Sequence, residues 1–211
     1  DAIAHWEAKT PLKFVERDNQ KDYVYFTDGI GCSSYVGRQG GQQIVSIEPY
    51  CSLGSTIHEI GHAIGLWHEQ MRKDRDQFIT VNFDNMHPSS WPNFQTYEER
   101  GDTGEEHTET LDFNSIMMYD SFSFSTNKLP VMVKKDGSTF SAQRDGLSQG
   151  DIQGVKIMYS DGGNEDENDI CKDVAPYQQG ISYQTGYQVT YFGNLYQRTA
   201  TGWRWIGRCA S

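Results

Sequence analysis

The chain has 211 residues, with 18 lysines and arginines against 29 aspartates and glutamates, so its formal net charge at pH 7 is −11. This length suits one ordinary domain, or one domain with a small appendage, and the 13% of aromatic residues argue against a disordered chain. No apolar run approaches the roughly 18 residues of a membrane span. The acidic composition also argues against nucleic acid as a partner, because phosphate binding needs clustered lysines and arginines.

Hydrophobic patterning predicts both helices and strands in the first third of the chain. Residues 1–10 have the spacing of a helix that ends at Thr10, before a proline. Ser52 or Ser55 is a suitable N-cap for a second helix that runs to Gly65. Short strands are expected between these helices, at residues 12–15, 22–26 and 42–47.

The rest of the chain is predicted to contain a loop-rich stretch, a third helix and a small module. Prolines and glycines interrupt the polar stretch that follows the second helix. Ser148 and Asp151 form a capping box that starts the third helix. Residues 161–170 are acidic and read as a linker, and residues 171–211, with frequent tyrosine, tryptophan and glycine, read as a β module.

The four cysteines form an even set, which allows three disulfide connectivities. We favour the two pairings between neighbours, Cys32–Cys51 and Cys171–Cys209, because each closes a loop within one segment. Disulfides persist in oxidising compartments, so this interpretation predicts a secreted protein. Its first residues lack a charged-then-apolar leader, and we expect any signal peptide to have been removed or left out. The alternative is four reduced thiols in a cytosolic protein.

The most informative segment contains three histidines, His58, His62 and His68, and Glu59 directly after the first. On a helix, His58 and His62 stand one turn apart and both imidazoles can reach one metal ion. Gly65 suits the end of that helix, after which the chain can turn back and bring His68 to the same ion. Three imidazoles leave a tetrahedral zinc with one open position for water, which is the catalytic arrangement.

Two simpler interpretations of this segment are weaker. Surface histidines on a helix would explain one pair, but not the full pattern of five specified positions. A structural zinc site would need a fourth protein ligand and would leave Glu59 without a role.

The histidine segment resembles the metzincin zinc metalloproteases and, among them, the astacins, because Glu69 follows the third histidine. Similarity extends through residues 68–76 and 32–38, through the Met-turn-like Ser115-Ile-Met-Met-Tyr119, and through residues 143–148. The resemblance covers residues 1–160. It implies an α+β catalytic domain of two lobes, in which a mixed twisted sheet and the active-site helix precede a loop-rich lobe with one helix. The small β module closed by a disulfide would follow.

The resemblance also implies roles for individual residues. The three histidines would hold one catalytic Zn²⁺, and Glu59 would act as general base and proton shuttle. Met117 would form the thioether floor beneath the metal, and Tyr119 would stabilise the oxyanion. The chain would then be a secreted zinc endopeptidase that hydrolyses internal peptide bonds of proteins.

Two further features are expected to contact substrate. Arg144 is the nearest candidate for a basic residue that accepts an acidic side chain just after the cleaved bond, and a solvated loop charge is the alternative. Residues 42–47 are expected to form the cleft edge that pairs with an extended peptide. We expect a monomer that binds neither nucleic acid nor membrane.

The sequence departs from the family pattern in two places. Only Cys32–Cys51 corresponds to a family disulfide, so Cys171–Cys209 would belong to the tail. Astacins have about thirty residues before the position of Asp1, and in them the N-terminal amine packs against the glutamate that follows the third histidine. Either the sequence is incomplete or processed, or Glu69 has another partner. The resemblance further implies a zymogen whose inhibitory pro-segment is not in this sequence.

The tail resembles small chitin- and cellulose-binding modules of bacterial secreted enzymes. Tyr183, Trp203 and Trp205 are candidates for a platform on which sugar rings stack, and the alternative is that these aromatics form the core of the module. A non-catalytic adhesion or carbohydrate-binding protein on an inactive protease scaffold is the competing function. The complete set of Glu59 and three histidines argues against it. Acidic clusters outside these motifs lack a spaced calcium-binding loop and are expected to be solvated.

Overall fold

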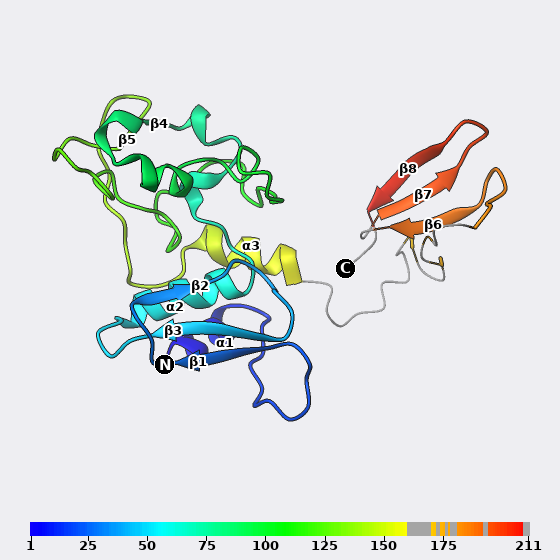
Figure 1. Cartoon of the computed structure of the whole chain (residues 1–211), viewed down its shortest axis with the longest axis horizontal. Helices are drawn as coiled ribbons and strands as arrows, with labels where there is room; N and C mark the ends of the chain where they lie inside the picture. Colours follow the sequence, from blue (N-terminus) through cyan, green and yellow to red (C-terminus); the bar gives the residue numbers. More distant parts are fainter. Residues whose placement is uncertain (160–169, 172–173, 176, 178–180, 192–193, 209–211) are drawn as a thin grey trace. The chain divides into compact units, whose positions relative to one another are not determined.

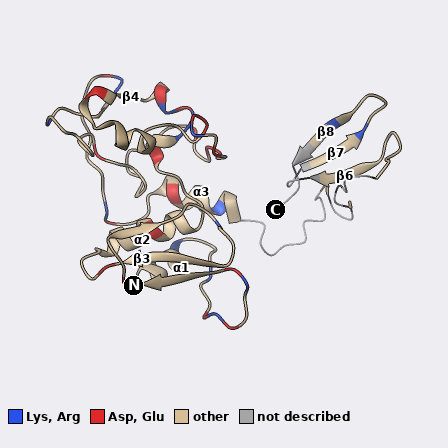
Figure 2. Ribbon diagram, in the orientation of Figure 1, with Lys and Arg blue, Asp and Glu red and all other residues tan. Residues whose placement is uncertain are grey.

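Figure 1 shows the computed structural model, which describes residues 1–159, 170–171, 174–175, 177, 181–191 and 194–208. The chain divides into two compact units, Asp1–Ile157 and Met158–Ser211. Within the described residues, no helix has both the length and the hydropathy needed to cross a membrane. Lysine, arginine, aspartate and glutamate are scattered along many elements rather than gathered on one (Figure 2).

The first unit begins with two helices and a three-stranded sheet. The helices are α1 (Ala2–Lys9) and α2 (Leu53–Ala63), and the strands are β1 (Tyr23–Thr27), β2 (Cys32–Ser34) and β3 (Gln42–Ile47). Helix α2 packs against α1 and against strands β2 and β3. The expected helices at residues 1–10 and from Ser52, and the strands near residues 22–26 and at 42–47, are therefore confirmed.

Helix α2 begins and ends as its sequence predicts. The cap is Ser52 rather than Ser55, because the Ser52 hydroxyl accepts a hydrogen bond of 3.0 Å from the backbone N–H of Ser55. At the other end, Gly65 has a φ of 111°, which a residue with a Cβ rarely adopts. The chain reverses there towards His68.

Strand order corrects one expectation about the cleft. Strand β3 lies between β1, which runs parallel to it, and β2, which runs antiparallel. Both edges of β3 are therefore paired, and the prediction that residues 42–47 form the cleft edge is wrong. Strand β2 is an edge strand of this sheet, and it packs against α2.

The expected strand at residues 12–15 is also wrong, because local side chains take the backbone groups there. The N–H of Leu12 donates to the Thr10 hydroxyl at 3.4 Å, and the N–H of Phe14 donates to a carboxylate oxygen of Glu7 at 2.9 Å. Leu12 and Phe14 still pack against the hydrophobic core, so their apolar character reflects burial rather than strand pairing.

Between α2 and the last helix of this unit, regular structure is sparse. The segment contains a two-stranded antiparallel sheet, β4 (Ile79–Val81) with β5 (Met132–Lys134), and four short 3-10 helices, η1 (Glu69–Met71), η2 (Arg75–Gln77), η3 (Phe83–Asn85) and η4 (Pro88–Asn93). Helix α3 (Gln149–Tyr159) follows. Its predicted capping box is confirmed: Asp151 N–H donates to the Ser148 hydroxyl, and Ser148 N–H donates to the Asp151 carboxylate, both at 2.9 Å.

Two hydrophobic cores hold the first unit together. The first lies among the helices and contains Ala2, Trp6, Ile57, Ile60, Ile116, Met117, Leu147 and Val155. The second lies in the loop-rich part and contains Ile79, Met86, Phe94, Leu111, Met118, Val131 and Met132. The neighbours Met117 and Met118 thus belong to different cores, which makes their turn the joint between the two lobes.

The second unit contains an antiparallel sheet, as expected for a β module. Strand β7 (Asn194–Arg198) lies between β6 (Gln188–Tyr191) and β8 (Trp203–Arg208). Val189 and Leu195 are its most buried apolar side chains among the described residues. All of the predicted linker except Ile170 lies outside the described residues, and so does Cys209 of the predicted Cys171–Cys209 disulfide. The Cys32–Cys51 disulfide is present, with a Cα–Cα distance of 6.0 Å.

Candidate active site

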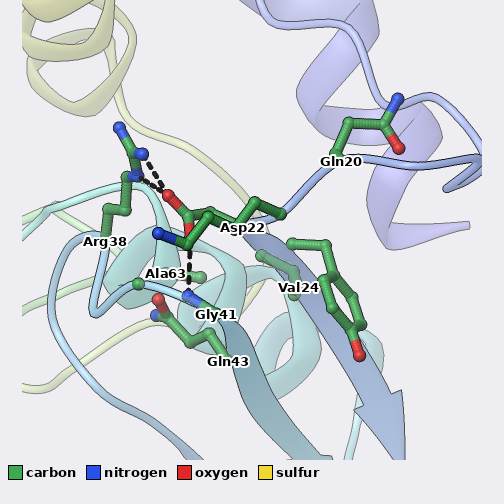
Figure 3. A pocket seen from close by; sticks show the side chains of 10 residues that line it. Gln20, Asp22, Val24, Arg38, Gly41, Gln43 and Ala63 are labelled. Carbon is green, nitrogen blue, oxygen red and sulfur yellow. Dashed lines mark hydrogen bonds and ion pairs between the residues drawn. The ribbon is translucent and has the colours of Figure 1, made fainter.

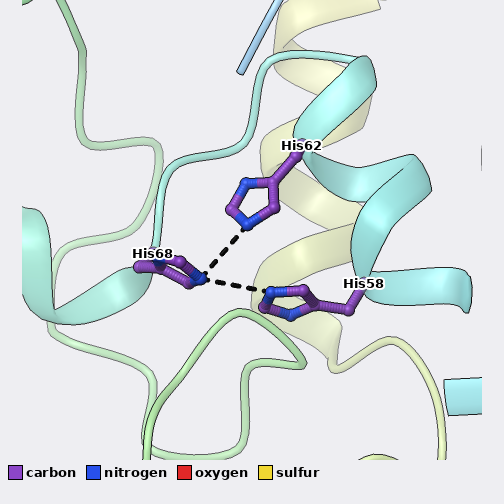
Figure 4. Close-up of side chains that lie close together, drawn as sticks. All are labelled: His58, His62 and His68. Carbon is purple, nitrogen blue, oxygen red and sulfur yellow. Dashed lines mark hydrogen bonds between the residues drawn. The ribbon is translucent and has the colours of Figure 1, made fainter. Parts of the chain in front are cut away.

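The three histidines converge from two directions, as Figure 4 shows. His58 and His62 project from consecutive turns of α2, and His68 approaches from the segment that follows the Gly65 turn. The Nε2 atom of His68 lies 3.2 Å from Nε2 of His58 and 3.1 Å from Nε2 of His62. Among the described residues, these three are the group of potential metal ligands whose donor atoms lie within 4.8 Å of one another.

This donor set fits zinc. Nitrogen ligands in a tetrahedral zinc site with Zn–N bonds of about 2.0–2.1 Å are separated by about 3.3 Å, close to the observed spacing. The Nδ1 atom of His58 lies 2.8 Å from the Ile116 carbonyl oxygen, and Nδ1 of His62 lies 2.8 Å from the Leu66 carbonyl oxygen. Each Nδ1 therefore donates to a carbonyl, which leaves the Nε2 lone pair facing the metal position.

Burial keeps the imidazoles neutral, as metal ligands must be. Removal from water lowers the pKa of His58 to about 3 and that of His62 to about 4, and it takes the pKa of His68 well below its usual value. Neighbouring imidazoles lower the pKa values of His58 and His68 further. The site is thus set up to accept a cation rather than protons.

Glu59 is buried beside the histidines on α2. Burial raises the pKa of its carboxyl to about 7, while the positive charge of Arg144 and a hydrogen bond from the Ser34 backbone N–H act in the opposite direction. A carboxyl near this pKa can both accept and return a proton at neutral pH. The Ser34 contact also places the edge strand β2 directly beside Glu59.

The Met-turn packs beneath this helix. The sulfur of Met117 lies so close to Gly61 that a Cβ there would sit 2.8 Å from it. Because residue 61 is a glycine, the Met-turn can approach α2 closely beside His62. The buried carboxylate of Asp151 holds the turn from the other side, because it accepts hydrogen bonds from the Ser115 hydroxyl at 2.6 Å and from the Ile116 N–H at 2.9 Å.

Tyr119 lies in an aromatic cluster next to the third histidine. Its ring centre is 4.3 Å from that of His68, 5.7 Å from that of Phe124 and 6.0 Å from that of Phe94. Burial, together with the charge of Glu59, raises the pKa of its hydroxyl to about 12. The hydroxyl therefore keeps its proton at neutral pH and can donate a hydrogen bond.

Arg144 lies near the N-terminal end of α2. Its guanidinium donates to the carbonyl oxygens of Met118 at 3.1 Å and Gln143 at 2.7 Å. Its backbone carbonyl packs so closely on α2 that a Cβ on Gly54 would lie 1.7 Å from the oxygen. Glycine at position 54 is therefore required for this contact.

Glu69 has its partners within the loop-rich lobe. One carboxylate oxygen accepts a hydrogen bond of 2.8 Å from the Asp112 backbone N–H and lies 3.4 Å from the Arg72 guanidinium. Burial raises the pKa of the carboxyl to about 7, although the Asp112 and Arg72 contacts oppose this rise.

The structure brings the expected zinc ligands together with Glu59, Met117, Tyr119 and Arg144. Sequence reasoning missed two supporting residues. The capping box identified Asp151 only as a helix cap, not as the anchor of the Met-turn. Phe124 carried no motif, yet it adopts a left-handed backbone with φ of 63°, and its ring lies beside that of Tyr119.

Another hollow, of about 520 Å³, lies at the start of β1 (Figure 3). The Asp22 carboxylate there pairs with Arg38 and accepts a hydrogen bond of 2.6 Å from the Gly41 N–H. These contacts tie the loop before β3 to the start of β1, and the charges of Asp22 and Arg38 cancel.

The aromatic candidates of the second unit lie partly at its surface. The ring centres of Tyr183 and Trp203 are 5.4 Å apart, and Tyr177 and Tyr187 extend the same cluster. Trp203 is 37% and Trp205 58% exposed, whereas the aliphatic Val189 and Leu195 are buried.

Comparison with known proteins agrees with this geometry. Residues 1–160 match the family model described as Astacin, a peptidase family. Flavastacin from Elizabethkingia meningoseptica is 43% identical over 155 residues, which are 72% of this chain and 34% of that protein. Zinc metalloproteinase nas-14 from Caenorhabditis elegans is 38% identical over 166 residues, 76% of this chain and 33% of that protein.

A solved structure shares the fold. High choriolytic enzyme 1, a hatching enzyme zinc-protease from Oryzias latipes, superposes with a TM-score of 0.68 at 32% identity, over 75% of this chain and 79% of that one. The chain spans about a third of the length of flavastacin and of nas-14. His58, His62 and His68 form the zinc site typical of this family. The chain belongs to the astacin family of zinc metalloendopeptidases.

Proposed function

We propose that this protein is a secreted endopeptidase that cleaves internal peptide bonds of proteins at the histidine site. The observation that carries the proposal is the buried cluster of three Nε2 atoms beside Glu59, a carboxyl whose pKa lies at about 7. When bound, Zn²⁺ would lower the pKa of a coordinated water and polarise the scissile carbonyl.

Each nearby side chain then has a defined part in the reaction. Glu59 accepts the proton of the attacking water and passes it to the nitrogen that leaves. The Tyr119 hydroxyl, which stays protonated at neutral pH, donates a hydrogen bond to the oxygen that becomes negative. Met117 supports the metal site from below through its contact with Gly61.

Substitution of Glu59→Gln tests this assignment, because the amide keeps the shape of the side chain but cannot take up the proton. We expect kcat/KM for a protein substrate such as casein to fall by about 10²–10⁴-fold, with the zinc content unchanged. The exposed Glu16→Gln makes the same chemical change outside the site and is the control. A Glu59→Gln enzyme with normal turnover would overturn the proposal.

Tyr119→Phe removes only the hydroxyl and tests the oxyanion role. Loss of one such donor is expected to lower kcat by about 10²–10³-fold with little change in KM. An equal rise in KM at constant kcat would instead assign Tyr119 to substrate binding.

For Arg144 we propose a role in binding an acidic side chain just after the cleaved bond. Its charge lies close enough to Glu59 and Tyr119 to act on the pKa of both. A pair of peptides with Asp or Asn at that position measures the preference directly. Arg144→Ala is expected to abolish it, whereas the exposed Arg38→Ala is expected to keep it.

The proposed location, state and activation follow from the same reasoning. The Cys32–Cys51 disulfide supports secretion, because such bonds persist in oxidising compartments. We propose a monomer that acts on proteins or peptides and is made with an inhibitory pro-segment. Native mass spectrometry of protein recovered from the culture medium and from cells tests the location, the mass and the processing.

The exposed aromatic cluster supports a second candidate function, carbohydrate binding by the second unit. Val189 and Leu195 are buried, whereas Trp203 is 37% and Trp205 58% exposed, so both indole rings reach the surface of the module. Flat aromatic faces at a surface suit the apolar faces of sugar rings. Pull-down on chitin and cellulose tests the proposal, and retention that survives Trp203→Ala and Trp205→Ala would contradict it.

A further inference from the structure

A second hollow of about 530 Å³ lies in the first unit, beside the histidine site. The loop that follows β2 provides Tyr35 and Gly37, and the turn after α2 provides Gly65 and Trp67. The loop-rich lobe contributes Arg100, Asp102 and Thr103. The hollow is therefore lined by segments of both lobes, and its Trp67 directly precedes His68.

The residues around the hollow show where it lies relative to Glu59 and to helix α2. Ser34 marks the level of the general base, because its N–H donates to Glu59. Beyond Ser34 the chain continues past Tyr35 to Gly37, whose N–H donates to the His62 carbonyl at 2.8 Å. The hollow thus lies at the C-terminal end of α2. Arg144 packs on Gly54 at the opposite end of that helix, so the two features flank the site.

The direction of a bound peptide follows from the edge strand. Among the described strands, β2 pairs with β3 alone, so its other edge, apart from the Ser34 N–H that donates to Glu59, is open to an extended peptide. A peptide that runs antiparallel to β2 places its N-terminal residues beside the C-terminal end of β2, next to Tyr35. The hollow then faces substrate residues that precede the cleaved bond, and Arg144 faces those that follow it.

Aromatic rings and backbone form part of the wall of the hollow, and the polar side chains of Gln39, Arg100 and Asp102 also line it. The indole N–H of Trp67 donates to the Thr103 carbonyl at 3.1 Å, which holds the ring in place. Tyr35 is 71% exposed at the rim. A Cβ on Gly37 would lie 3.9 Å from Cα of Gly65, so these two glycines bring bare backbone together at the base.

Charge in the hollow is internally balanced. The guanidinium of Arg100 lies 5.9 Å from the centre of the Trp67 ring, and its Nε is 2.9 Å from a carboxylate oxygen of Asp102. Both residues line the hollow, so a charged substrate side chain would have to compete with their ion pair. A large uncharged side chain gains contact with the Trp67 and Tyr35 rings without breaking it.

We propose that this hollow is a substrate subsite that binds an aromatic or large aliphatic side chain on the N-terminal side of the cleaved bond. The inference rests on the proposed peptidase function and adds a specificity to it. Trp67 and Tyr35 are the residues that determine this specificity, through ring contact rather than through charge.

A set of internally quenched peptides with one fixed cleavage site tests the subsite. Each of the four positions before the bond is occupied in turn by Ala, Leu, Phe, Asp or Lys. At one position, Phe or Leu is expected to raise kcat/KM over Ala by about 10-fold or more, the range for a filled apolar pocket. Asp and Lys are expected to give no gain at that position.

Two variants and one control connect the preference to the hollow. Tyr35→Ala and Trp67→Ala are expected to reduce the advantage of Phe over Ala at least threefold, while Trp67→Phe, which keeps a ring, retains most of it. Tyr25→Ala removes a half-exposed ring from β1, on the opposite edge of the sheet, and is expected to change nothing. Because Trp67 precedes a zinc ligand, cleavage of the Ala peptide and zinc content are measured for each variant.

The outcomes separate the subsite from the activity. Cleavage of the Ala peptide with no preference at any of the four positions would overturn the subsite and leave the peptidase function intact. A preference for Asp or Lys, or one that survives both alanine variants, would also overturn it. If the wild-type protein with bound zinc cleaves no peptide or protein, the peptidase function fails, and the subsite with it.

Discussion

The two hydrophobic cores of the first unit lie in regions that satisfy their backbone hydrogen-bonding groups by different means. In the first hydrophobic core, helices α1, α2 and α3 satisfy most of their own backbone groups, and apolar side chains such as Trp6, Ile60 and Val155 fill the space between them. In the loop-rich lobe, buried polar side chains take over this role. Arg75 is 3% exposed and donates to the carbonyl oxygens of Gln70 and Phe94.

Other side chains of the loop-rich lobe also donate hydrogen bonds to backbone carbonyls. The Arg72 guanidinium donates to the Thr108 carbonyl at 3.0 Å, and the Gln70 amide donates to the Asn93 carbonyl at 3.1 Å. Such contacts replace a helix or sheet ladder where the chain follows an irregular path. This difference implies that the stability of the loop-rich lobe depends on individual polar side chains. Single substitutions of these side chains should therefore lower its stability strongly.

The joint between the lobes should be the most sensitive point of all. Asp151→Ala leaves the buried Ile116 N–H, the half-buried Ser148 N–H and the Ser115 hydroxyl without their acceptor, which we expect to cost about 3–5 kcal/mol of folding free energy. Ile116 also holds His58 through its carbonyl, so zinc affinity should fall by about 10–100-fold. Urea unfolding and zinc titration with a chelator measure the two effects.

The control for the joint is Asp145→Ala, which removes an exposed carboxylate nearby in the chain. It should change stability by less than about 0.5 kcal/mol. Equal effects of the two substitutions would show that Asp151 does not connect the lobes.

Arg75→Met tests the loop-rich lobe by itself. The apolar side chain fills similar space but leaves the Gln70 and Phe94 carbonyls unpaired, and we expect a loss of about 2–4 kcal/mol. Arg38→Met removes a 79% exposed guanidinium that pairs with Asp22 and should cost under about 1 kcal/mol. Thermal unfolding of both variants compares a buried arginine with an exposed one.

Ser52→Ala tests the N-terminal cap of helix α2, where we expect a smaller loss of folding free energy because the helix keeps its apolar packing. Loss of the cap bond to the Ser55 N–H is expected to cost about 1 kcal/mol, with peptidase activity retained because the histidines lie further along α2. Ser52→Asp supplies another capping oxygen and should restore most of the stability. A loss that Asp does not restore would contradict the capping role.

The smallest expected effect concerns Glu106 of the loop-rich lobe, whose side chain is 13% exposed and pairs with the half-exposed Lys73. Burial by itself raises the pKa of Glu106, but hydrogen bonds from the Tyr97 hydroxyl and from Lys73 outweigh it and hold the pKa below its ordinary value of 4.5. Because the folded-state pKa is depressed, Glu106 stabilises the fold at pH above about 4.5. This contribution is lost as the pH falls through the folded-state value.

Glu106→Gln should therefore lower stability by less than about 1 kcal/mol at pH 7 and reduce the acid dependence of unfolding below pH 4.5. Unfolding midpoints of the variant and the wild type between pH 3 and pH 7 measure the difference. Parallel pH profiles for the two proteins would show that Glu106 contributes nothing through its charge.

Local signals predicted a large share of the structure. The spacing of His58 and His62 and the glycine at position 65 identified the metal-binding helix and its end, because one turn of helix fixes which residues stand together. The Ser148–Asp151 capping box located the start of α3 for the same reason. These features depend on residues a few positions apart, and the structure agrees with them.

Other features depended on segments far apart in the chain. The apolar residues 12–15 suggested a strand, yet Glu7 and Thr10 take their N–H groups, and only the packed structure shows the competition. The sequence did not reveal that Asp151 reaches the Met-turn 35 residues earlier, or that Trp67 binds the backbone of Thr103.

By itself, then, the sequence determined the metal ligands, the helix that presents them and the family, because these rest on short-range periodicity and a specific motif. The tertiary structure alone decided that β2 rather than β3 is the edge strand beside Glu59. It also decided how the two cores meet at Met117 and Met118, and where the hollow beside Trp67 lies. The physical reason is that strand order and packing are set by contacts between distant segments, which no local pattern encodes.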